Sequence, residues 1–418
     1  MDGIVVDSGD TAWMLTSTAL VLMMTIPGLF LFYGGLVRSK NVLSTIMHSF
    51  FCAALISVTW VLYGYTLAFG PDVGGLIGGL DFLGLNGVLG SSQALAPTIP
   101  HVLFVAYQAT FAVITPALIS GTFAERIRFP AFALYMLLWT TFIYGPLAHW
   151  VWGGGWIGTR IGALDFAGGT VVHISSGVSA LVTALYLGKR MGYPQQPMPP
   201  HNLAFSVIGA ALLWVGWFGF NAGSAVSAGQ LAATAFLNTN TAAAAATLGW
   251  MIAEWLRSGK PTLLGAASGA VAGLVCITPG AGFVTPLAAI VFGLAGGVVC
   301  YFAVSLKPLL GYDDALDVVG VHMIGGTLGA ILTGVFATGA VNAAVPALSL
   351  GLDGGLLYGH PEMVRQQVLA IAVTYVFCGV GTLAILVVVD ALAPLRAPAD
   401  DERMGLDLSQ HSEQAYTS

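Results

Sequence analysis

Two apolar segments decide the fold of this chain: GGTVVHISSGVSALVTALYLG at 168–188 and DVVGVHMIGGTLGAILTGVF at 317–336. Each is about long enough to cross a bilayer as a helix, and each carries one histidine, His173 or His322. An ionisable side chain is costly to place inside a membrane, so it marks a functional site by default. Two histidines in matching settings therefore indicate a shared pathway through the membrane.

The composition is that of an integral membrane protein. Of 418 residues, 57% are hydrophobic and only 8% are charged, and the mean hydropathy is +0.86. Soluble proteins carry about 25% charged residues, so this chain could not cover a water-exposed surface. The 55 glycines suit the close packing of membrane helices.

The same composition argues against several other classes. No basic run supports nucleic-acid binding. The four cysteines are scattered in apolar segments, with neither zinc spacing nor a disulfide framework, so we expect packed thiols, no metal and no cofactor. The first ten residues, MDGIVVDSGD, lack the basic-then-apolar order of a signal peptide.

The chain is expected to be all-α, with eleven membrane-spanning helices of about 20 apolar residues each. The candidate spans are 12–34, 43–69, 101–123, 131–151, 167–188, 203–222, 237–256, 262–279, 285–306, 318–338 and 367–391. The breaks between them are weakest at 222–237 and 279–285.

Positive charges orient the spans, because Lys and Arg gather on the cytoplasmic side. With the N-terminus outside, only Arg160 and Arg365 of the 13 Lys and Arg residues fall outside, and the other eleven fall inside. We therefore expect the N-terminus outside and the C-terminus inside, in the inner or plasma membrane. Residues 70–100 would form an outer loop, and residues 394–418 a cytoplasmic tail.

Ten of the spans divide into two halves of five, 12–188 and 203–338, which leaves 367–391 as a last helix. An odd number of spans inverts the second half, as in many transporters whose site lies near the midplane. An aspartate precedes each histidine by eight residues, Asp165 before His173 and Asp314 before His322. Eight helical residues rise about 12 Å, so we expect the histidines to meet from opposite faces.

Two facing imidazoles can share one hydrogen bond and keep two nitrogens free for a small polar solute. They can also pass a proton. The alternative interpretation is two unrelated histidines that each bond a carbonyl in a helix contact. A metal site is disfavoured, because catalytic zinc usually has three protein ligands and no further ligands are visible nearby in the sequence.

Aromatic residues are the other markers inside the spans. Phe111 lies in YQATFAVITPALISG, Trp217 and Phe220 lie in WVGWFGFNAGS, and Trp152 begins WGGGW. Any one of them alone would be ordinary packing. An aromatic face can bind a cation with about 2 kcal/mol when desolvated. Trp152 and Ser224 fall near the same outer side and together predict an external cation-recruiting site.

These segments resemble the ammonium transporter family (Amt/Rh), on its bacterial Amt side. The matching stretches follow the family's order along the chain: FYGGLVRSKNVLS at 32–44, GTFAERIRFPAF at 121–132, HWVWGGG at 149–155, GALDFAGGTVVHI at 162–174, GWFGFNAGSA at 216–225, GKPTLLGAASGAVAGLV at 259–275 and DVVGVHMIGGTLG at 317–329. A match of this length and order is specific.

The resemblance implies a transport domain, 1–393, of two inverted five-helix halves plus a last helix. It also implies a homotrimer with one path per subunit. Phe111 and Phe220 would be the stacked pair that closes the path from outside, and Trp217 a further aromatic that lines the pore. His173 and His322 would be the twin histidines of the family.

The resemblance also assigns the outer site. Trp152 and Ser224 look like the ammonium-recruiting pair, and Asp165 like the buried carboxylate that shapes their site without touching the solute. Tyr107 takes the place of a third outer aromatic, usually Phe, and so adds a hydroxyl at the substrate site. The tail sequence DERMGLDLSQHSEQAY resembles the regulatory region on the cytoplasmic face, where a PII-type signal protein docks in many members.

We therefore expect ammonium uptake across the lipid bilayer, with capture outside, deprotonation at the Phe gate and electrogenic passage along the histidines. Burying a bare cation costs tens of kcal/mol in the idealised limit, which a cation–π contact of about 2 kcal/mol cannot offset. Ammonium, unlike potassium, can give up its proton. The alternatives are a neutral ammonia or carbon dioxide channel and an ammonium sensor that binds without conducting. An enzyme is disfavoured, because no triad order, metal cluster or phosphate loop supports one.

Overall fold

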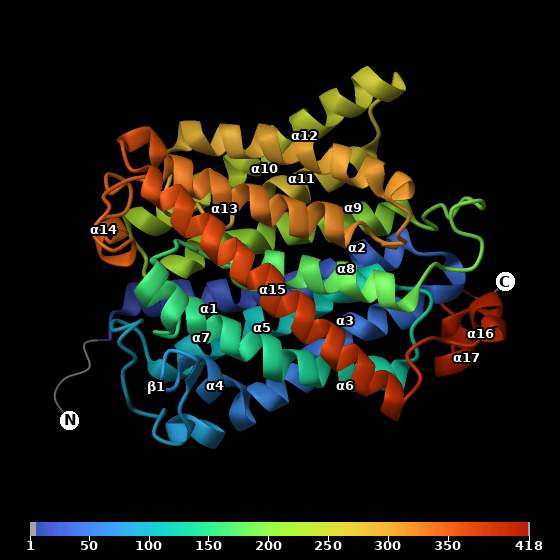
Figure 1. Ribbon diagram of the computed structural model, residues 1–418, viewed down its shortest axis with the longest axis horizontal. Helices are drawn as coiled ribbons and strands as arrows, with labels where there is room; N and C mark the ends of the chain where they lie inside the picture. Colours follow the sequence, from blue (N-terminus) through green and yellow to red (C-terminus); the bar gives the residue numbers. More distant parts are fainter. Residues whose placement is uncertain (1–5, 417–418) are drawn as a thin grey trace.

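The computed structural model describes residues 6–416. Regular structure within these residues is almost entirely helical, as the sequence predicts. The helices lie side by side along the long axis of the molecule, and α15 crosses the front of the bundle (Figure 1). The outer limits of the predicted domains, 1–5 and 417–418, lie outside the described residues.

The bundle has two distinct ends (Figure 1). The β1 end carries the antiparallel pair β1 (Asp72–Val73) and β2 (Ile77–Gly78) and the short helix α14 (Val345–Leu348). The opposite end, called the tail end, carries α16 (Ala399–Met404) and α17 (Leu406–His411).

The remaining helices of the first half are α1 (Ser8–Met23), η1 (Met24–Leu29), α2 (Phe30–Leu36), η2 (Ser39–Asn41), α3 (Val42–Thr59), η3 (Trp60–Gly64), α4 (Tyr65–Phe69), η4 (Leu80–Leu85), α5 (His101–Phe123), α6 (Phe129–Trp139), η5 (Thr140–Tyr144), α7 (Gly145–Val151), η6 (Ile157–Ile161), η7 (Gly169–Ile174) and α8 (Ser175–Leu187). Those of the second predicted half are α9 (Leu203–Trp217), η8 (Phe218–Ala222), η9 (Gly223–Ala225), α10 (Gln230–Ser258), α11 (Leu263–Ile277), α12 (Pro286–Leu310), η10 (Val319–Met323) and α13 (Ile324–Phe336). After it come η11 (Leu356–Tyr358) and α15 (Pro361–Leu392), which contains the predicted last helix.

Nine helical runs within residues 6–416 are long and apolar enough to cross a membrane. They match nine of the eleven predicted spans, with ends that differ by a few residues; the predicted span 12–34, for example, lies within Ser8–Leu36. The predicted span 262–279 coincides with the shorter helix α11. The predicted span 237–256 lies inside α10, whose run of Ala, Thr and Asn is less hydrophobic. The chain is thus a helical protein of membrane type, and the count of eleven stays a prediction.

The two histidine-bearing segments cross where glycines allow close approach. Helix α8 contacts η10, and α13 contacts η7. A Cβ on Gly177 of α8 would lie 2.3 Å from the Met323 backbone nitrogen, and a Cβ on Gly326 of α13 would lie 3.0 Å from His173 Cβ. Small residues at helix contacts let backbones approach in this way, and here they bring the start of each segment beside the start of the other.

Candidate functional site

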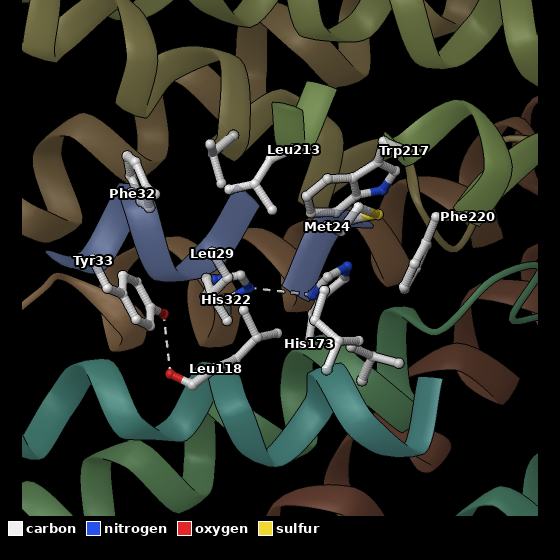
Figure 2. Close-up of a pocket in the computed structure, with 13 residues that line it drawn as sticks. Met24, Leu29, Phe32, Tyr33, Leu118, His173, Leu213, Trp217, Phe220 and His322 are labelled. Carbon is white, nitrogen blue, oxygen red and sulfur yellow. Dashed lines mark hydrogen bonds between the residues drawn. The ribbon is translucent and has the colours of Figure 1, made fainter. Parts of the chain in front are cut away.

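Each histidine lies in one widened helical turn at the start of its segment. His173 lies in η7 and His322 in η10, both π-helical turns, which are frequent at functional sites. Their Nδ1 atoms are 3.2 Å apart, and their ring planes are inclined by 27°. Both side chains are buried. The histidines therefore meet, as the sequence predicts (Figure 2).

Asp165 and Asp314 precede their helices rather than lie in them. The sequence predicts eight helical residues between each aspartate and its histidine, and this is wrong, because the helical turns begin at Gly169 and Val319. The Asp165 carboxylate instead accepts hydrogen bonds from three consecutive backbone N–H groups, at 168–170. Such N–H groups have no partner inside a helix, so the carboxylate fixes where η7 begins.

Thr278, which no sequence pattern marks, sets the tautomers of the pair. A hydroxyl has one proton, and Thr278 Oγ1 donates it to the Leu274 carbonyl at 2.7 Å. The same oxygen accepts from the Trp217 indole N–H at 2.9 Å and lies 3.3 Å from His173 Nε2. Neutral His173 therefore holds its proton on Nε2 and offers a lone pair at Nδ1. His322 then donates from Nδ1 and keeps Nε2 as an acceptor.

A small, mostly apolar pocket contains the histidines (Figure 2). Its lining side chains are Met24, Leu29, Phe32, Tyr33, Ile114, Leu118, Val172, His173, Leu213, Trp217, Phe220, Val271 and His322. His322 also lines a second pocket with Ser268 and Asp317, on the side of the tail end. The acceptor nitrogen that stays free, Nε2 of His322, thus belongs to the histidine that borders this second pocket.

Two phenylalanines lie between the pocket that contains the histidines and an open pocket at the β1 end. The ring centroids of Phe111 and Phe220 are 4.3 Å apart, with planes inclined by 30°, and both side chains are buried. Trp152 packs edge-on against Phe111 at 6.0 Å, and Phe220 stacks on His173, also at 6.0 Å. Trp217 also stacks on His173, with ring centroids 5.5 Å apart. Aromatic rings therefore continue from the outer pocket to the histidines.

An open pocket at the β1 end is lined by Trp152, Ser224, Asp165 and Phe111. The Trp152 indole N–H donates to the main-chain oxygen of Asp165 at 2.9 Å, which fixes the ring at the pocket. Ser224 Oγ donates to the Phe220 carbonyl at 2.8 Å. Because its one proton is used there, Ser224 can only accept from a solute. The structure thus brings together the residues predicted for the recruiting site.

Tyr107 lies behind this pocket and not in its lining. Its fully buried hydroxyl lies 2.9 Å from the Gly219 carbonyl, 3.0 Å from the Phe220 carbonyl and 3.2 Å from Ser224 Oγ. The carbonyls of the π-turn η8 therefore hold the Tyr107 hydroxyl, and a direct contribution of Tyr107 to the substrate site stays a prediction.

Three polar residues of the pocket were not predicted. Gln108, Thr159 and Asn342 line it. Gln108 stands in the apolar span 101–123, and a polar side chain inside a span is a signal that could have identified it. Asn342 lies in the loop before α14, where nothing in the sequence distinguishes it from other loop residues.

The C-terminal residues pack on the tail end. The Asp407 carboxylate accepts from the backbone N–H groups of Leu43 and Ser44, at 3.0 and 2.8 Å. Lys40 Nζ donates to the carbonyls of residues 402 and 403. The side chain of Asn41 accepts from the Leu406 N–H at 2.8 Å. The tail is therefore docked on the tail end of the bundle, and the cytoplasmic location of that end stays a prediction.

A buried ion-pair network lies next to the tail. Glu125 pairs with Arg38 at 2.7 Å and with Arg190 at 3.3 Å. Arg190 also pairs with Asp313 at 2.8 Å. Burial acts to raise the pKa of Glu125 and of Asp313, but the arginines outweigh it and hold both pKa values below their ordinary range. Both carboxylates are thus charged in the folded protein at neutral pH.

Comparison with known proteins gives one consistent family. The profile of the Ammonium Transporter Family matches residues 12–416. An ammonium transporter of Bacillus subtilis is 56% identical over 98% of this chain and 98% of its own length. The crystal structure of Saccharomyces cerevisiae Mep2 is 38% identical, with a TM-score of 0.88 over 95% of this chain and 89% of its own. A structure titled Sensor Amt Protein is 26% identical, with a TM-score of 0.87 over 96% of this chain and 98% of its own.

Proposed function

Because the chain belongs to the Ammonium Transporter Family, we propose that it takes up ammonium through the passage that contains His173 and His322. The observation that carries this proposal is the order of groups along the passage. A cation-binding pocket comes first, then the closed Phe111–Phe220 pair, and then two hydrogen-bonded imidazoles. That order suits a solute that arrives charged and crosses uncharged.

Capture takes place at the β1 end. The Trp152 ring supplies a cation–π face, worth about 2 kcal/mol when desolvated. Ser224 supplies an oxygen that can only accept, which fits ammonium because each of its N–H groups donates. The Asp165 carboxylate is occupied by backbone N–H groups, so it shapes the site without binding the cation.

Deprotonation takes place near the Phe pair. A bare cation pays tens of kcal/mol in the idealised limit to enter a low-dielectric passage, far more than cation–π contact returns. Ammonium escapes this penalty by leaving its proton behind, and potassium cannot. Ammonia then passes His173 and His322, and the proton follows through the histidine pair, which makes net transport electrogenic.

The orientation and assembly belong to the same proposal. The β1 end faces outside and the tail end faces the cytoplasm of an inner or plasma membrane, with eleven spans. The bias of the Lys and Arg residues supports this orientation. A homotrimer and a PII-type partner at the tail end rest on family resemblance, and the docked tail offers that face a defined surface.

The test is the current carried by purified protein in a supported membrane after an ammonium pulse, with potassium as the reference ion. The unaltered protein is expected to give a sustained current for ammonium alone, in proportion to protein density. The double variant His173→Ala, His322→Ala is expected to lose this selectivity. His360→Gln is the matched control, since His360 bonds Asp353 in a loop at the β1 end.

Three outcomes would contradict parts of the proposal. Unchanged selectivity in the double variant would remove the histidines from the mechanism. A small transient signal that does not scale with the lipid-to-protein ratio would mean binding without turnover, as in a sensor; the resemblance to the Sensor Amt Protein makes this the alternative to exclude. Ammonia uptake without current would identify a neutral channel.

A further inference from the structure

The turn that carries Trp152 is hydrogen-bonded to a hairpin that lies far from it in sequence. Residues 72–78 form the β1–β2 hairpin, and residues 149–156 comprise the last turn of α7 and the turn that follows it. The Trp150 indole N–H donates to the Leu76 carbonyl at 2.7 Å, and the Trp156 N–H donates to the Gly75 carbonyl at 3.1 Å. The hairpin therefore supports the backbone on either side of Trp152.

His149 is a buried side chain between this turn and the hairpin. Its Nδ1 lies 2.9 Å from the Ala68 carbonyl oxygen, and its Nε2 lies 2.9 Å from a carboxylate oxygen of Asp72. Both partner atoms are acceptors, and a neutral imidazole has only one N–H. Both hydrogen bonds can form together only when the ring is an imidazolium with two N–H donors.

The same residue also holds the turn through its main chain. The His149 carbonyl accepts from the N–H groups of Gly153 and Gly155, at 3.0 and 2.9 Å. A Cβ on Gly153 would lie 2.7 Å from His149 Nδ1, so the ring packs directly against the backbone that follows Trp152. Movement of the His149 ring is thus transmitted to the Trp152 backbone.

We propose that His149, as a buried imidazolium, is a positioning residue for Trp152 and makes ammonium capture weaken as the pH rises. The inference rests on the proposed function and adds a control to its outer site. Loss of the ring proton removes one of the two hydrogen bonds, which frees either the hairpin or the end of α4 from the turn. Trp152 then presents its ring less firmly to the cation.

The groups that face the His149 ring come from the hairpin and from α4. Asp72, on the hairpin, faces Nε2, and the hydrogen bond from His149 holds the pKa of Asp72 below its ordinary value. Arg160 of η6 acts on the same carboxylate. From α4, His149 faces only the neutral Ala68 carbonyl. Within residues 6–416, Asp72 is the one charged group in hydrogen-bond contact with the ring.

The test is the half-saturating ammonium concentration of the current between about pH 5.5 and pH 8.5, the range in which histidines change charge. The concentration is expressed as the cation, and maximal current is recorded separately. For the unaltered protein we expect the half-saturating value to rise by roughly fivefold to tenfold across this range, as one charge-assisted hydrogen bond is lost. Maximal current should not follow it.

Three variants separate positioning from general damage. His149→Gln, which has no titrating proton, should show the high half-saturating value at every pH with its maximal current retained. Asp72→Asn keeps an oxygen acceptor but removes the charge that stabilises the imidazolium, so its rise should occur at lower pH. His360→Gln removes a histidine from the other His–Asp pair of this end and should follow the unaltered protein.

Superimposable pH curves for the unaltered protein and His149→Gln would overturn the inference, as would equal loss of maximal current and affinity. If the unaltered protein carries no ammonium current, the proposed function fails, and the inference is decided without transport. Nitrogen NMR of labelled histidine then reports the ring directly, through the signal that disappears in His149→Gln. An imidazolium at about pH 6 is expected, and a neutral ring at that pH would overturn the assignment.

Discussion

The two aspartate–histidine segments share one frame, but their carboxylates are bound differently. In each, the aspartate accepts the backbone N–H five residues ahead: Thr170 N lies 2.8 Å from Asp165, and Val319 N lies 2.7 Å from Asp314. Asp165 also accepts from two glycine N–H groups and from the Thr170 hydroxyl. Asp314 Oδ1, in contrast, is buried with no partner among residues 6–416.

The two segments thus share a backbone geometry but differ in the chemistry of their carboxylates. The Asp165 carboxylate is held in place by the donors around it. Burial raises the pKa of Asp314 above its ordinary value, although the Lys307 ammonium partly opposes this. One segment therefore begins at a carboxylate that several donors hold in place, and the other begins at a carboxylate that is easily neutralised.

Of the variants that test this difference, Asp165→Ala should have the largest effect on stability. It leaves three consecutive backbone N–H groups without an acceptor, and each buried unsatisfied group costs about 1–3 kcal/mol. The free energy of unfolding should fall by at least about 3 kcal/mol, measured by denaturation in detergent. Asp314→Ala removes the acceptor of one N–H and should cost about a third as much. Equal losses would show that the two carboxylates do the same structural work.

The asymmetry continues into the histidines, and Thr278→Val is the variant that exposes it. Only His173 has a hydroxyl partner beside the pair, and the change leaves both its Nε2–H and the Trp217 indole N–H without an acceptor. We expect a loss of about 1–2 kcal/mol in stability and a severalfold lower maximal ammonium current, because the tautomers are no longer fixed. Thr278→Ser keeps the hydroxyl and should behave as the unaltered protein. If the two variants conduct equally, the tautomer assignment is wrong.

The sequence was sufficient for the frame and insufficient for this asymmetry. Apolar length predicts the spans, and the shared spacing of Asp165–His173 and Asp314–His322 predicts that the histidines meet. The start of each helix could not be read in this way, because it depends on which backbone N–H groups a carboxylate reaches. Thr278 comes from α11, more than 100 residues from His173, and only tertiary packing places it at the pair.

Tyr107 illustrates the same limit at the outer site. Its position in the chain matches an aromatic that faces the solute, and sequence alone predicts a hydroxyl there. The direction of that hydroxyl depends on carbonyls that the π-turn η8 exposes. Such turns are local departures from regular helix, and no hydropathy pattern reports them.

The smallest effect on stability is expected for Asp314→Asn. Whether this variant is more or less stable than the unaltered protein is a sharper test than the size of the change. The pKa of Asp314 is raised in the folded protein, so the folded state binds this proton more tightly than the unfolded state does. Its contribution to stability is present below the unfolded pKa, about 3.9, and is lost as the pH rises. Asparagine does not titrate. As the pH rises from about 4 to neutral, the free energy of unfolding of the variant should therefore increase relative to that of the unaltered protein, by about 1 kcal/mol or less.

Asp313→Asn is the matched control, because the neighbouring carboxylate has the opposite shift. Arg190 holds the pKa of Asp313 low against the effect of burial, so that carboxylate stabilises the fold above its unfolded pKa and loses its contribution as the pH falls. Neutralising it leaves the Arg190 charge buried beside a neutral group, and the variant should lose stability at neutral pH. Thermal unfolding of both variants across this pH range should give slopes of opposite sign relative to the unaltered protein. Slopes of the same sign would mean that Asp314 is charged and paired like Asp313, and that the two segments differ less than their hydrogen bonds indicate.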